Sequence, residues 1–254
     1  MKILIGGALG RMGRELAQCA QAADIAVACG VDVAYRGQAT DFPMVTGFDH
    51  ATAQADVLVD FSRADALPEL LQMALQTKMP AVLCATGYTD AELLRIKEAS
   101  AHIAILRSAN MSLGVSVLRA LVAMAAKALG EDFDIEIVEK HHRMKQDSPS
   151  GTALMLLEAA QAARSDDTTP VYGRYGRNEK REPHDIGLHA IRGGTVTGEH
   201  EVGFYGNGEQ LLLTHRAENR ALFAQGALKA ACFLAGKPAG LYSMQDVVSE
   251  IMGQ

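Results

Sequence analysis

The first half of the chain alternates short apolar runs with helix-like segments, and this alternation restricts the possible folds more than any other feature. Apolar runs fall at 2–6, 26–31, 57–61, 81–85 and 103–107, and helix-like segments fall at 11–22, 64–77 and 90–101. Strands separated by helical stretches of this length pair in parallel through right-handed crossovers. We therefore predict an α/β domain with a doubly wound parallel sheet, in which the loop-rich residues 34–50 have no assigned element.

The pattern changes after Asn110. We predict helices over 113–129, 152–163 and 220–235, strands over 135–139, 186–192, 195–205 and 210–216, and a closing segment over 241–252. Asn207-Gly208 matches a type I′ hairpin turn, so the strands on either side of it are expected to pair antiparallel. The polar segment 165–185, which contains two prolines, indicates an extended loop. These elements predict a second, smaller α+β domain with a mixed sheet.

Charge and composition exclude several classes of partner. The formal net charge of −6 argues against nucleic acid and acidic membranes, which bind basic surfaces. The four cysteines have no CxxC or other ligand spacing, so we expect reduced thiols. The apolar start of the chain is broken by glycines and is too short for a signal peptide, and no uninterrupted apolar stretch reaches membrane-spanning length. A cytoplasmic protein without a membrane partner is expected.

A glycine-containing loop joins the first strand to the first helix and reads Gly7-Ala8-Leu9-Gly10-Arg11-Met12-Gly13. Glycine permits the tight turn, small residues let the backbone approach a pyrophosphate, and the helix N-terminus offers N–H groups to the anion. The spacing is GxxGxxG rather than GxGxxG, so a plain strand–helix turn is the alternative. Asp32 ends the second strand 19 residues beyond Gly13, near the spacing of an acid that binds the adenine ribose, although it could be a solvated strand-end residue. The two features together predict a dinucleotide site.

The run Lys140-His141-His142-Arg143-Met144-Lys145 is a basic cluster in an acidic chain. It leads into a predicted helix that Ser150 or Thr152 can cap, and basic side chains beside a helix N-terminus suit a carboxylate or a phosphate. A histidine in such a cluster can deliver a proton near neutral pH. A solvated basic turn is the alternative. A metal site is disfavoured, because adjacent histidines on extended backbone point to opposite sides and no third ligand lies at helical spacing.

The segment from Glu139 to Ala153 resembles a long and specific motif, E-x-H-H-x-x-K-x-D-x-P-S-G-T-A, of the 4-hydroxy-tetrahydrodipicolinate reductase family (formerly dihydrodipicolinate reductase) of bacterial lysine biosynthesis. Further matches lie along the whole chain, at Gly7–Gly13, Asp60-Phe61-Ser62, Ala85-Thr86-Gly87, Ala109-Asn110-Met111-Ser112, Gly198-Glu199-His200 and Thr214-His215-Arg216. The resemblance implies a metal-free cytoplasmic enzyme of the diaminopimelate pathway, usually a homotetramer. It would transfer hydride from NADH or NADPH to a cyclic unsaturated dicarboxylic acid and release tetrahydrodipicolinate. It also implies a dinucleotide-binding domain of residues 1–111 and 217–254 and a substrate-binding and oligomerisation domain of residues 112–216.

The resemblance also implies roles for single residues. His141 would be the general acid that protonates the ring carbon beside the one receiving hydride, with Lys145 as its partner. His142 would bind the substrate, and Ser150, Gly151 and Thr152 would hold one carboxylate. The implied cofactor-binding residues are Gly7, Gly10, Arg11, Met12, Gly13, Asp32, Ala85, Thr86, Gly87, Ala109, Asn110, Arg220 and Phe223.

Two departures from the family pattern bear on the cofactor. The family's loop often reads G-T-T-G where this chain has Cys84-Ala85-Thr86-Gly87, which can alter hydrogen bonding to the nicotinamide. Val33 follows Asp32 where relatives that use both cofactors often carry a basic residue. An acid without an adjacent cation repels a 2′-phosphate, so we expect NADH to be favoured unless Arg11 or Arg36 supplies the charge. Another nicotinamide enzyme of similar build, such as an amino-acid or semialdehyde dehydrogenase, and a non-catalytic dinucleotide sensor are the alternative functions.

Overall fold

A computed structural model of the chain describes residues 1–51 and 54–253, and these residues form two compact units. Residues 1–113 together with 220–254 make the first unit, and residues 114–219 make the second. The chain therefore leaves the first unit once and returns to it for its last elements. Each unit has its own sheet and its own buried core.

The sheet of the first unit has seven parallel strands in the order β12-β6-β5-β4-β1-β2-β3. These strands are β1 (Lys2–Gly6), β2 (Ala26–Val31), β3 (Met44–Val45), β4 (Val57–Asp60), β5 (Ala81–Leu83), β6 (Ala104–Arg107) and β12 (Gly240–Tyr242). Both β4 and β5 are buried at every position, as expected of central strands that helices cover on both faces. The strand order runs outward from β1 in both directions, which confirms the predicted doubly wound α/β fold.

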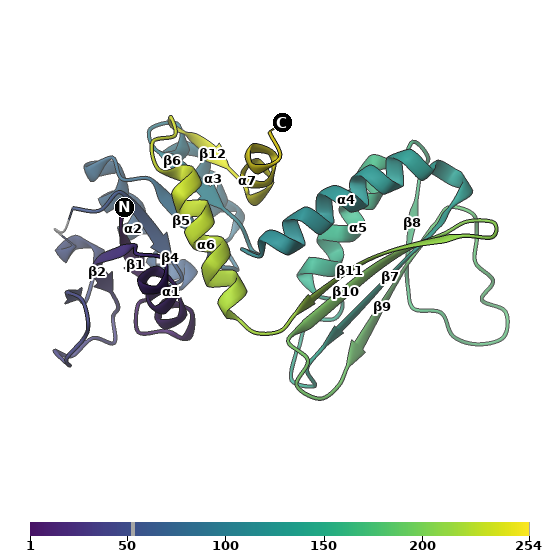
Figure 1. Cartoon of the computed structure of the whole chain (residues 1–254), viewed down its shortest axis with the longest axis horizontal. Coiled ribbons are helices and arrows are strands. Elements are labelled where there is room, and N and C mark those ends of the chain that lie inside the picture. The colour runs from purple at the N-terminus through teal and green to yellow at the C-terminus, as the bar shows by residue number, and fades with distance from the viewer. Residues whose placement is uncertain (52–53, 254) are drawn as a thin grey trace. The chain divides into compact units, whose positions relative to one another are not determined.

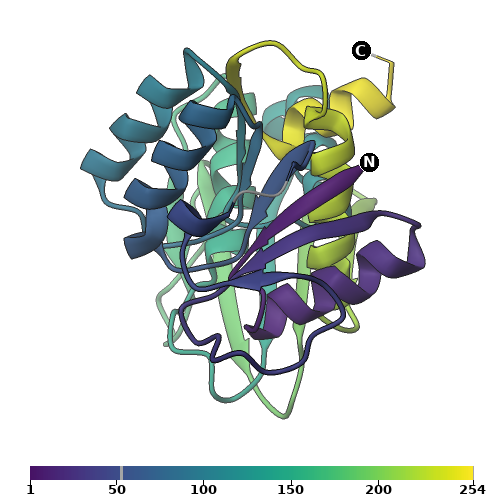
Figure 2. The ribbon, with the colours of Figure 1, turned by 90° about the vertical axis from the view of Figure 1, so that its left-hand side faces the viewer.

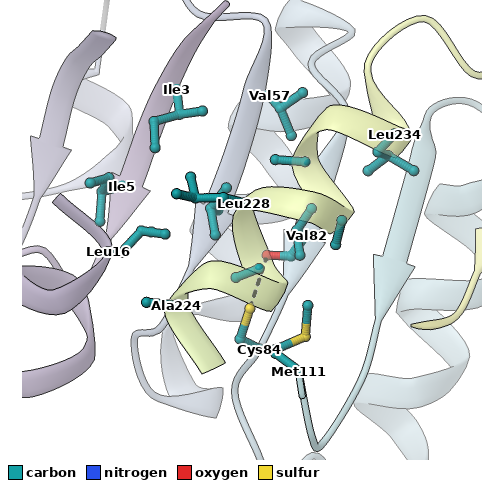
Figure 3. Packing of buried hydrophobic residues seen from close by; sticks show 14 of the residues in the cluster. Ile3, Ile5, Leu16, Val57, Val82, Cys84, Met111, Ala224, Leu228 and Leu234 are labelled. Carbon is teal, nitrogen blue, oxygen red and sulfur yellow. Dashed lines mark hydrogen bonds between the residues drawn. The ribbon is translucent and has the colours of Figure 1, made fainter. Parts of the chain in front are cut away.

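Helices cover both faces of this sheet (Figure 2). The helices α1 (Arg11–Ala22) and α6 (Ala221–Leu234) lie on one face, and α2 (Leu67–Thr77) and α3 (Asp90–Ser100) lie on the other. Alternation along β1 divides its side chains between the two layers, because successive residues of a strand point to opposite faces. Ile3 and Ile5 therefore pack under α6 with Leu228, as Figure 3 shows, while Leu4 packs with the α2 and α3 layer.

The chain ends with β12 and the helix α7 (Met244–Ile251), where a single closing segment was expected. Ser243 starts α7 with a capping box, in which its side chain accepts from the helix backbone and Asp246 accepts from the Ser243 N–H. Met244 and Val247 join the same core as α1 and α6. These contacts fasten the C-terminal segment to the first unit.

The sheet of the second unit is mixed and has the order β11-β10-β7-β9-β8. Its strands are β7 (Asp134–His141), β8 (Thr169–Tyr172), β9 (Asp185–Arg192), β10 (Gly198–Tyr205) and β11 (Gln210–Ala217). The strand β7 pairs in parallel with β9 and antiparallel with β10, which confirms the predicted mixed sheet. The helices α4 (Leu113–Leu129) and α5 (Gly151–Ala163) cover one face of it (Figure 1), where Ile135 and Ile137 of β7 are buried.

Two local predictions are wrong. Residues Thr169–Tyr172 form β8 inside the segment predicted as a loop, because they pair with β9, an interaction that the local sequence does not reveal. Asn207 lacks the positive φ that a type I′ turn requires, so Gly208, with φ 86°, supplies the left-handed residue of a different turn. The helical stretch Leu113–Asp132 is long and apolar enough to cross a membrane by length and composition, although Arg119 and Lys127 interrupt its apolar run. Leu118, Val122 and Ala126 of this stretch belong to the core of the second unit, and core helices of soluble proteins pass the same test.

Candidate active site

The glycine loop after β1 is packed tightly against neighbouring backbone. Gly7 has φ 69°, a left-handed conformation that glycine adopts without strain, and a Cβ there would lie 2.8 Å from the carbonyl oxygen of Phe61. A Cβ on Gly13 would lie 2.2 Å from the carbonyl oxygen of Gly7. Gly10 is the N-cap of α1, and no side chain among the described residues caps this helix end. The first-turn N–H groups of α1 can therefore bind an anion such as a pyrophosphate.

Asp32 lies beside the glycine loop at the end of β2. Its Oδ2 accepts a hydrogen bond from the Leu9 N–H, and its Oδ1 accepts one from the Ala34 N–H, both at 2.9 Å. Each carboxylate oxygen keeps a second acceptor position, which a ribose hydroxyl can use. Val33 is exposed, and the guanidinium of Arg36 donates to the Val33 carbonyl. The loop and the acid thus fit a dinucleotide.

The other predicted cofactor residues follow the carboxyl ends of neighbouring strands. Residues Ala85, Thr86 and Gly87 come after β5, and Ala109 and Asn110 come after β6. Ligands of open parallel sheets bind outside this edge. In the same unit, Arg220 is the N-cap of α6, and Phe223 in the first turn of that helix packs against the core. Arg11 and Met12 open α1 directly after the glycine loop.

Asp60 is a buried carboxyl group at this edge, and it had no separate role among the residues predicted from the sequence. It ends β4, and its Oδ1 accepts from the Ser62 N–H at 3.1 Å. A Cβ on Gly6 would lie 2.2 Å from the same oxygen, so only glycine fits beside it. Burial raises the pKa of Asp60 to about 6, against the opposing effect of the hydrogen bonds from Ser62. Burial, reinforced by the charge of Asp60, also raises the pKa of the nearby Cys84 thiol.

In the second unit, β7 places Glu139 and His141 on the helix-covered face of the sheet. Glu139 Oε2 lies 2.6 Å from His141 Nδ1, and Arg192 of β9 donates to both Glu139 oxygens at 2.7 and 2.8 Å. The Ser150 N–H donates to Oε1 at 3.0 Å. Burial works to raise the pKa of Glu139, but the hydrogen bonds from Arg192, His141 and the Ser150 N–H outweigh it and lower the pKa. Glu139 is therefore a fully buried, ionised carboxylate beside the histidine.

Ser150 connects this cluster to the N-terminus of α5. Its Oγ accepts from the Ala153 N–H at 3.2 Å, which caps the helix, and lies 3.1 Å from His200 Nε2. The Ser150 hydroxyl hydrogen can therefore be donated to Nε2, which leaves the proton of a neutral His200 on Nδ1. Burial, with a smaller effect of the neighbouring His141, lowers the pKa of His200 to about 4. The two histidine rings meet edge to face, with centroids 5.2 Å apart.

The remaining residues predicted for substrate binding lie along the same segment. Lys145 Nζ donates to Asp147 Oδ1 at 2.7 Å, and this interaction lowers the pKa of Asp147. His142 follows the last residue of β7 and is half-buried. Gly151 and Thr152 begin α5 directly after the Ser150 cap. Lys145 is therefore paired with an acid of its own loop, while His141 and Ser150 are joined through Glu139.

Arg192 and His200 also belong to this cluster but were not predicted from the sequence, and Glu139 had no separate predicted role. The alternation of β7 was a usable signal for Glu139, because it shares a face with the apolar Ile135 and Ile137. Arg192 lies 53 residues from Glu139, and His200 lies 50 residues from Ser150. Their contacts depend on the strand order β10-β7-β9, which no local pattern predicts.

The first unit carries a glycine loop, an uncapped helix N-terminus and an acid beside that loop, and the second carries a buried carboxylate–imidazole pair beside a helix cap. These features define a nucleotide-dependent oxidoreductase. A family model described as "Dihydrodipicolinate reductase, N-terminus" matches residues 1–111, and one described as "Dihydrodipicolinate reductase, C-terminus" matches residues 114–248. The chain belongs to the dihydrodipicolinate reductase family, as the motif resemblance predicted.

Curated relatives agree with this assignment along nearly the whole chain. The 4-hydroxy-tetrahydrodipicolinate reductase of Caldanaerobacter subterraneus subsp. tengcongensis is 46% identical over 251 residues, which cover 98% of this chain and 99% of the relative. The enzyme of the same name from Clostridium tetani is 43% identical over 250 residues, which cover 98% of this chain and 97% of the relative. The chain is therefore an oxidoreductase of amino-acid biosynthesis that uses a pyridine nucleotide.

Solved structures show the same fold. The dipicolinate-bound dihydrodipicolinate reductase from Paenisporosarcina sp. TG-14 superposes with a TM-score of 0.80 at 21% identity, covering 97% of this chain and 98% of the other. A probable dehydrogenase from Thermotoga maritima superposes with a TM-score of 0.61 at 11% identity, covering 97% and 92%. At these identities the likeness concerns the fold alone.

Proposed function

We propose that the chain reduces 4-hydroxy-tetrahydrodipicolinate to tetrahydrodipicolinate with NAD(P)H and one proton, while the 4-hydroxyl leaves as water, in the diaminopimelate route to lysine. The observation that carries this proposal is the position of His141. Its imidazole contacts a buried, ionised carboxylate, and the N-terminus of α5 begins within the same cluster. A group that can give a proton, His141, thus lies beside backbone N–H groups that can bind an anion. Reduction of a dicarboxylic acid needs both, one for the proton transfer and the other for a carboxylate.

The first unit is the proposed cofactor domain. Gly7, Gly10 and Gly13 would keep the loop close to the pyrophosphate, with Arg11 and Met12 beside it, and Asp32 would accept from the adenine ribose hydroxyls. The residues proposed to contact the rest of the dinucleotide are Ala85, Thr86, Gly87, Ala109, Asn110, Arg220 and Phe223. When bound, the nicotinamide supplies the hydride. NADH is the favoured form, because Asp32 is followed by the exposed, uncharged Val33.

The second unit is the proposed substrate domain. Ser150, Gly151 and Thr152 would hold one carboxylate at the N-terminus of α5, where the helix dipole favours negative charge. His142 and Lys145 would bind the remaining negative charge, with Lys145 released from Asp147 for that purpose. The Paenisporosarcina enzyme binds dipicolinate, a planar dicarboxylate, which supports a substrate of this class.

His141 is the proposed general acid. In its doubly protonated form the ring donates from Nδ1 to Glu139 and presents the Nε2 proton to the ring carbon of the substrate beside the one that receives hydride. The neutral imidazole that remains takes up a proton from water before the next turnover. Lys145 assists by holding the negative charge of the substrate during this transfer.

His141→Gln tests the proposal. We expect kcat to fall by roughly 10²–10⁴-fold, while the affinity for NADH is kept, because the side chain would act only on the proton. The assay follows NADH absorbance with freshly generated 4-hydroxy-tetrahydrodipicolinate, and repeating it with NADPH gives the ratio of the two kcat/KM values. A near-normal kcat in the variant rules out the acid role. Binding of NADH by the native protein without turnover would favour the dinucleotide sensor instead.

The proposed assembly is a cytoplasmic homotetramer formed by the second unit. One face of its sheet is covered by α4 and α5, and the opposite face is not covered by any helix of this unit (Figure 1). Large apolar side chains, Ile191, Tyr205 and Leu212, are exposed on the uncovered side. Exposed apolar side chains on such a sheet face support association with another copy of the chain.

A further inference from the structure

We propose that Glu139 is a positioning residue, which keeps the proton of neutral His141 on Nδ1 and so leaves Nε2 as the nitrogen that gives and takes up the catalytic proton. Arg192 fixes Glu139 for this task. The inference deepens the proposed function, because it rests on His141 acting as the acid. It is carried by the contacts of one buried carboxylate with three parts of the second unit.

The Glu139 carboxylate receives four donors from fixed positions. Oε2 lies 2.6 Å from His141 Nδ1 and 2.8 Å from Arg192 Nη1, while Oε1 accepts from Arg192 Nη2 at 2.7 Å and from the Ser150 N–H at 3.0 Å. An ionised carboxylate has only acceptor positions, so the hydrogen between Glu139 and His141 belongs to Nδ1. The neutral tautomer is thereby set by the buried acid, as in other histidines held by a carboxylate.

The Nε2 side of the ring is kept clear by a glycine. A Cβ on Gly198 would lie 3.1 Å from His141 Nε2 and 3.5 Å from Cδ2 of the same ring. Any larger residue at this position of β10 would press on the nitrogen that must reach the substrate. The ring is therefore fixed through Nδ1, and the β10 residue that faces Nε2 carries no side chain.

This arrangement suits a repeated proton transfer. When imidazolium His141 gives its Nε2 proton to the substrate carbon, the neutral ring that forms already has its remaining proton on Nδ1, facing Glu139. The hydrogen bond persists in both states, and neither a ring flip nor a tautomer exchange is needed before Nε2 is protonated again by water. A preorganised donor of this kind avoids reorganisation during the reaction.

Glutamine cannot replace this glutamate, although it has nearly the same shape. Its amide has one acceptor oxygen, and its NH₂ group must occupy the other oxygen position. If NH₂ replaces Oε1, it faces Arg192 Nη2 and the Ser150 N–H, and if it replaces Oε2, it faces Arg192 Nη1 and His141. In the second orientation His141 accepts at Nδ1, so its proton moves to Nε2 and the neutral tautomer is reversed.

Glu136 offers a matched control on the same strand. It lies three residues before Glu139 on the other face of β7, accepts from Arg174 Nη1 at 2.8 and 3.0 Å, and lies 2.8 Å from His189 Nε2. Glu136→Gln removes the same charge from a similar Arg–Glu–His group without contact to His141. It therefore reports what the loss of such an ion pair does at a position that does not contact His141.

The experiment compares the native protein, Glu139→Gln, Glu139→Asp and Glu136→Gln. We expect Glu139→Gln to lower kcat at least about 10²-fold, with little change in the KM for NADH, since loss of tautomer control is costly in other histidine enzymes. Glu139→Asp, which keeps a carboxylate, should recover part of that loss. Glu136→Gln should leave kcat within about threefold of the native value.

The decisive readout is the tautomer of His141 by ¹⁵N NMR of histidine-labelled protein, assigned with His141→Gln. At high pH the native ring should carry its proton on Nδ1, and Glu139→Gln should carry it on Nε2 for at least part of the population. A native Nε2–H tautomer overturns the inference even if the variant fails to fold. A kcat in Glu139→Gln equal to that of Glu136→Gln overturns it as well. Absence of turnover by the native protein would count against the proposed function, whereas the tautomer would still test the role of Glu139.

Discussion

His200 shows how one buried residue makes the protein sensitive to acid. Its folded pKa of about 4 lies below the ordinary value of 6.5, because the ring is buried and faces His141. Between these two values the unfolded chain binds a proton that the folded chain excludes. The free energy of unfolding should therefore fall as the pH is lowered from 6.5 to 4, by roughly 3 kcal/mol in total, and it should be regained above pH 6.5.

His200→Gln tests this pH dependence. The glutamine amide can still accept from the Ser150 hydroxyl but does not ionise, so the variant should lose less stability in acid than the native protein. Urea unfolding at several pH values between 4 and 8 measures the difference. His102→Gln, at an exposed histidine of the first unit, is the control. Parallel curves for His200→Gln and the native protein would show that His200 does not titrate in this window.

At the scale of elements, the glycine loop needs glycine at Gly13 because neighbouring backbone atoms leave no room for a Cβ, and not because the loop must be flexible. A Cβ on Gly13 would lie 2.2 Å from the Gly7 carbonyl oxygen and 2.7 Å from the Ala8 Cα, whereas a Cβ on Gly10 would lie 3.1 Å from the same oxygen. Gly13→Ala should therefore displace the start of α1 from the loop. We expect it to cost roughly 1–3 kcal/mol of stability and to weaken NADH binding strongly.

Gly10→Ala is the control for this prediction, because the two variants differ in how close the new Cβ comes to the Gly7 carbonyl oxygen. At 3.1 Å the neighbouring backbone needs to shift by only a few tenths of an ångström, so Gly10→Ala should be much milder in both measurements. Thermal unfolding and titration with NADH, followed by fluorescence, check the two variants. If both variants lose the same stability and the same affinity for NADH, then the close backbone contact at Gly13 is not the cause of the loss.

Most elements could be predicted from the sequence because their signals are local. The bounds of β1, α1, β2 and α4 agree with the predicted ranges, since each is a continuous apolar or amphipathic segment ended by glycine or polar residues. The strand β8 was missed because its formation depends on pairing with β9. The turn at Asn207 was assigned wrongly because only one of its two central residues adopts the left-handed conformation.

At the scale of the molecule, the difference between local signals and contacts of distant residues also explains which parts of the site could be predicted. The segment from His141 to Thr152 is continuous in sequence, so its basic residues and its helix cap were visible as a motif. The support of His141 is not continuous, because Glu139 is held by Arg192 from a different strand. The sequence therefore predicted the groups that would touch the substrate and missed those that hold them in place.

The uncovered sheet face of the second unit leads to a prediction about assembly. Paired positions on β10 and β11 place Leu212 opposite Gly203, and Tyr205 and Ile191 are exposed on the same side of the sheet. A second exposed apolar surface lies on α4 and includes Leu121 and Met124. A broad sheet face buries more area than one helix stripe, so we expect assembly to depend on the sheet.

Leu212→Arg and Met124→Arg, measured by sedimentation at micromolar concentration, distinguish the two surfaces. The native protein should sediment at about four times the chain mass of 27.1 kDa. Leu212→Arg should reduce that mass, because a buried unpaired charge on the sheet face opposes association, while Met124→Arg should leave it unchanged. The reverse pattern would assign the interface to α4, and a native monomer would show that the proposed homotetramer is wrong.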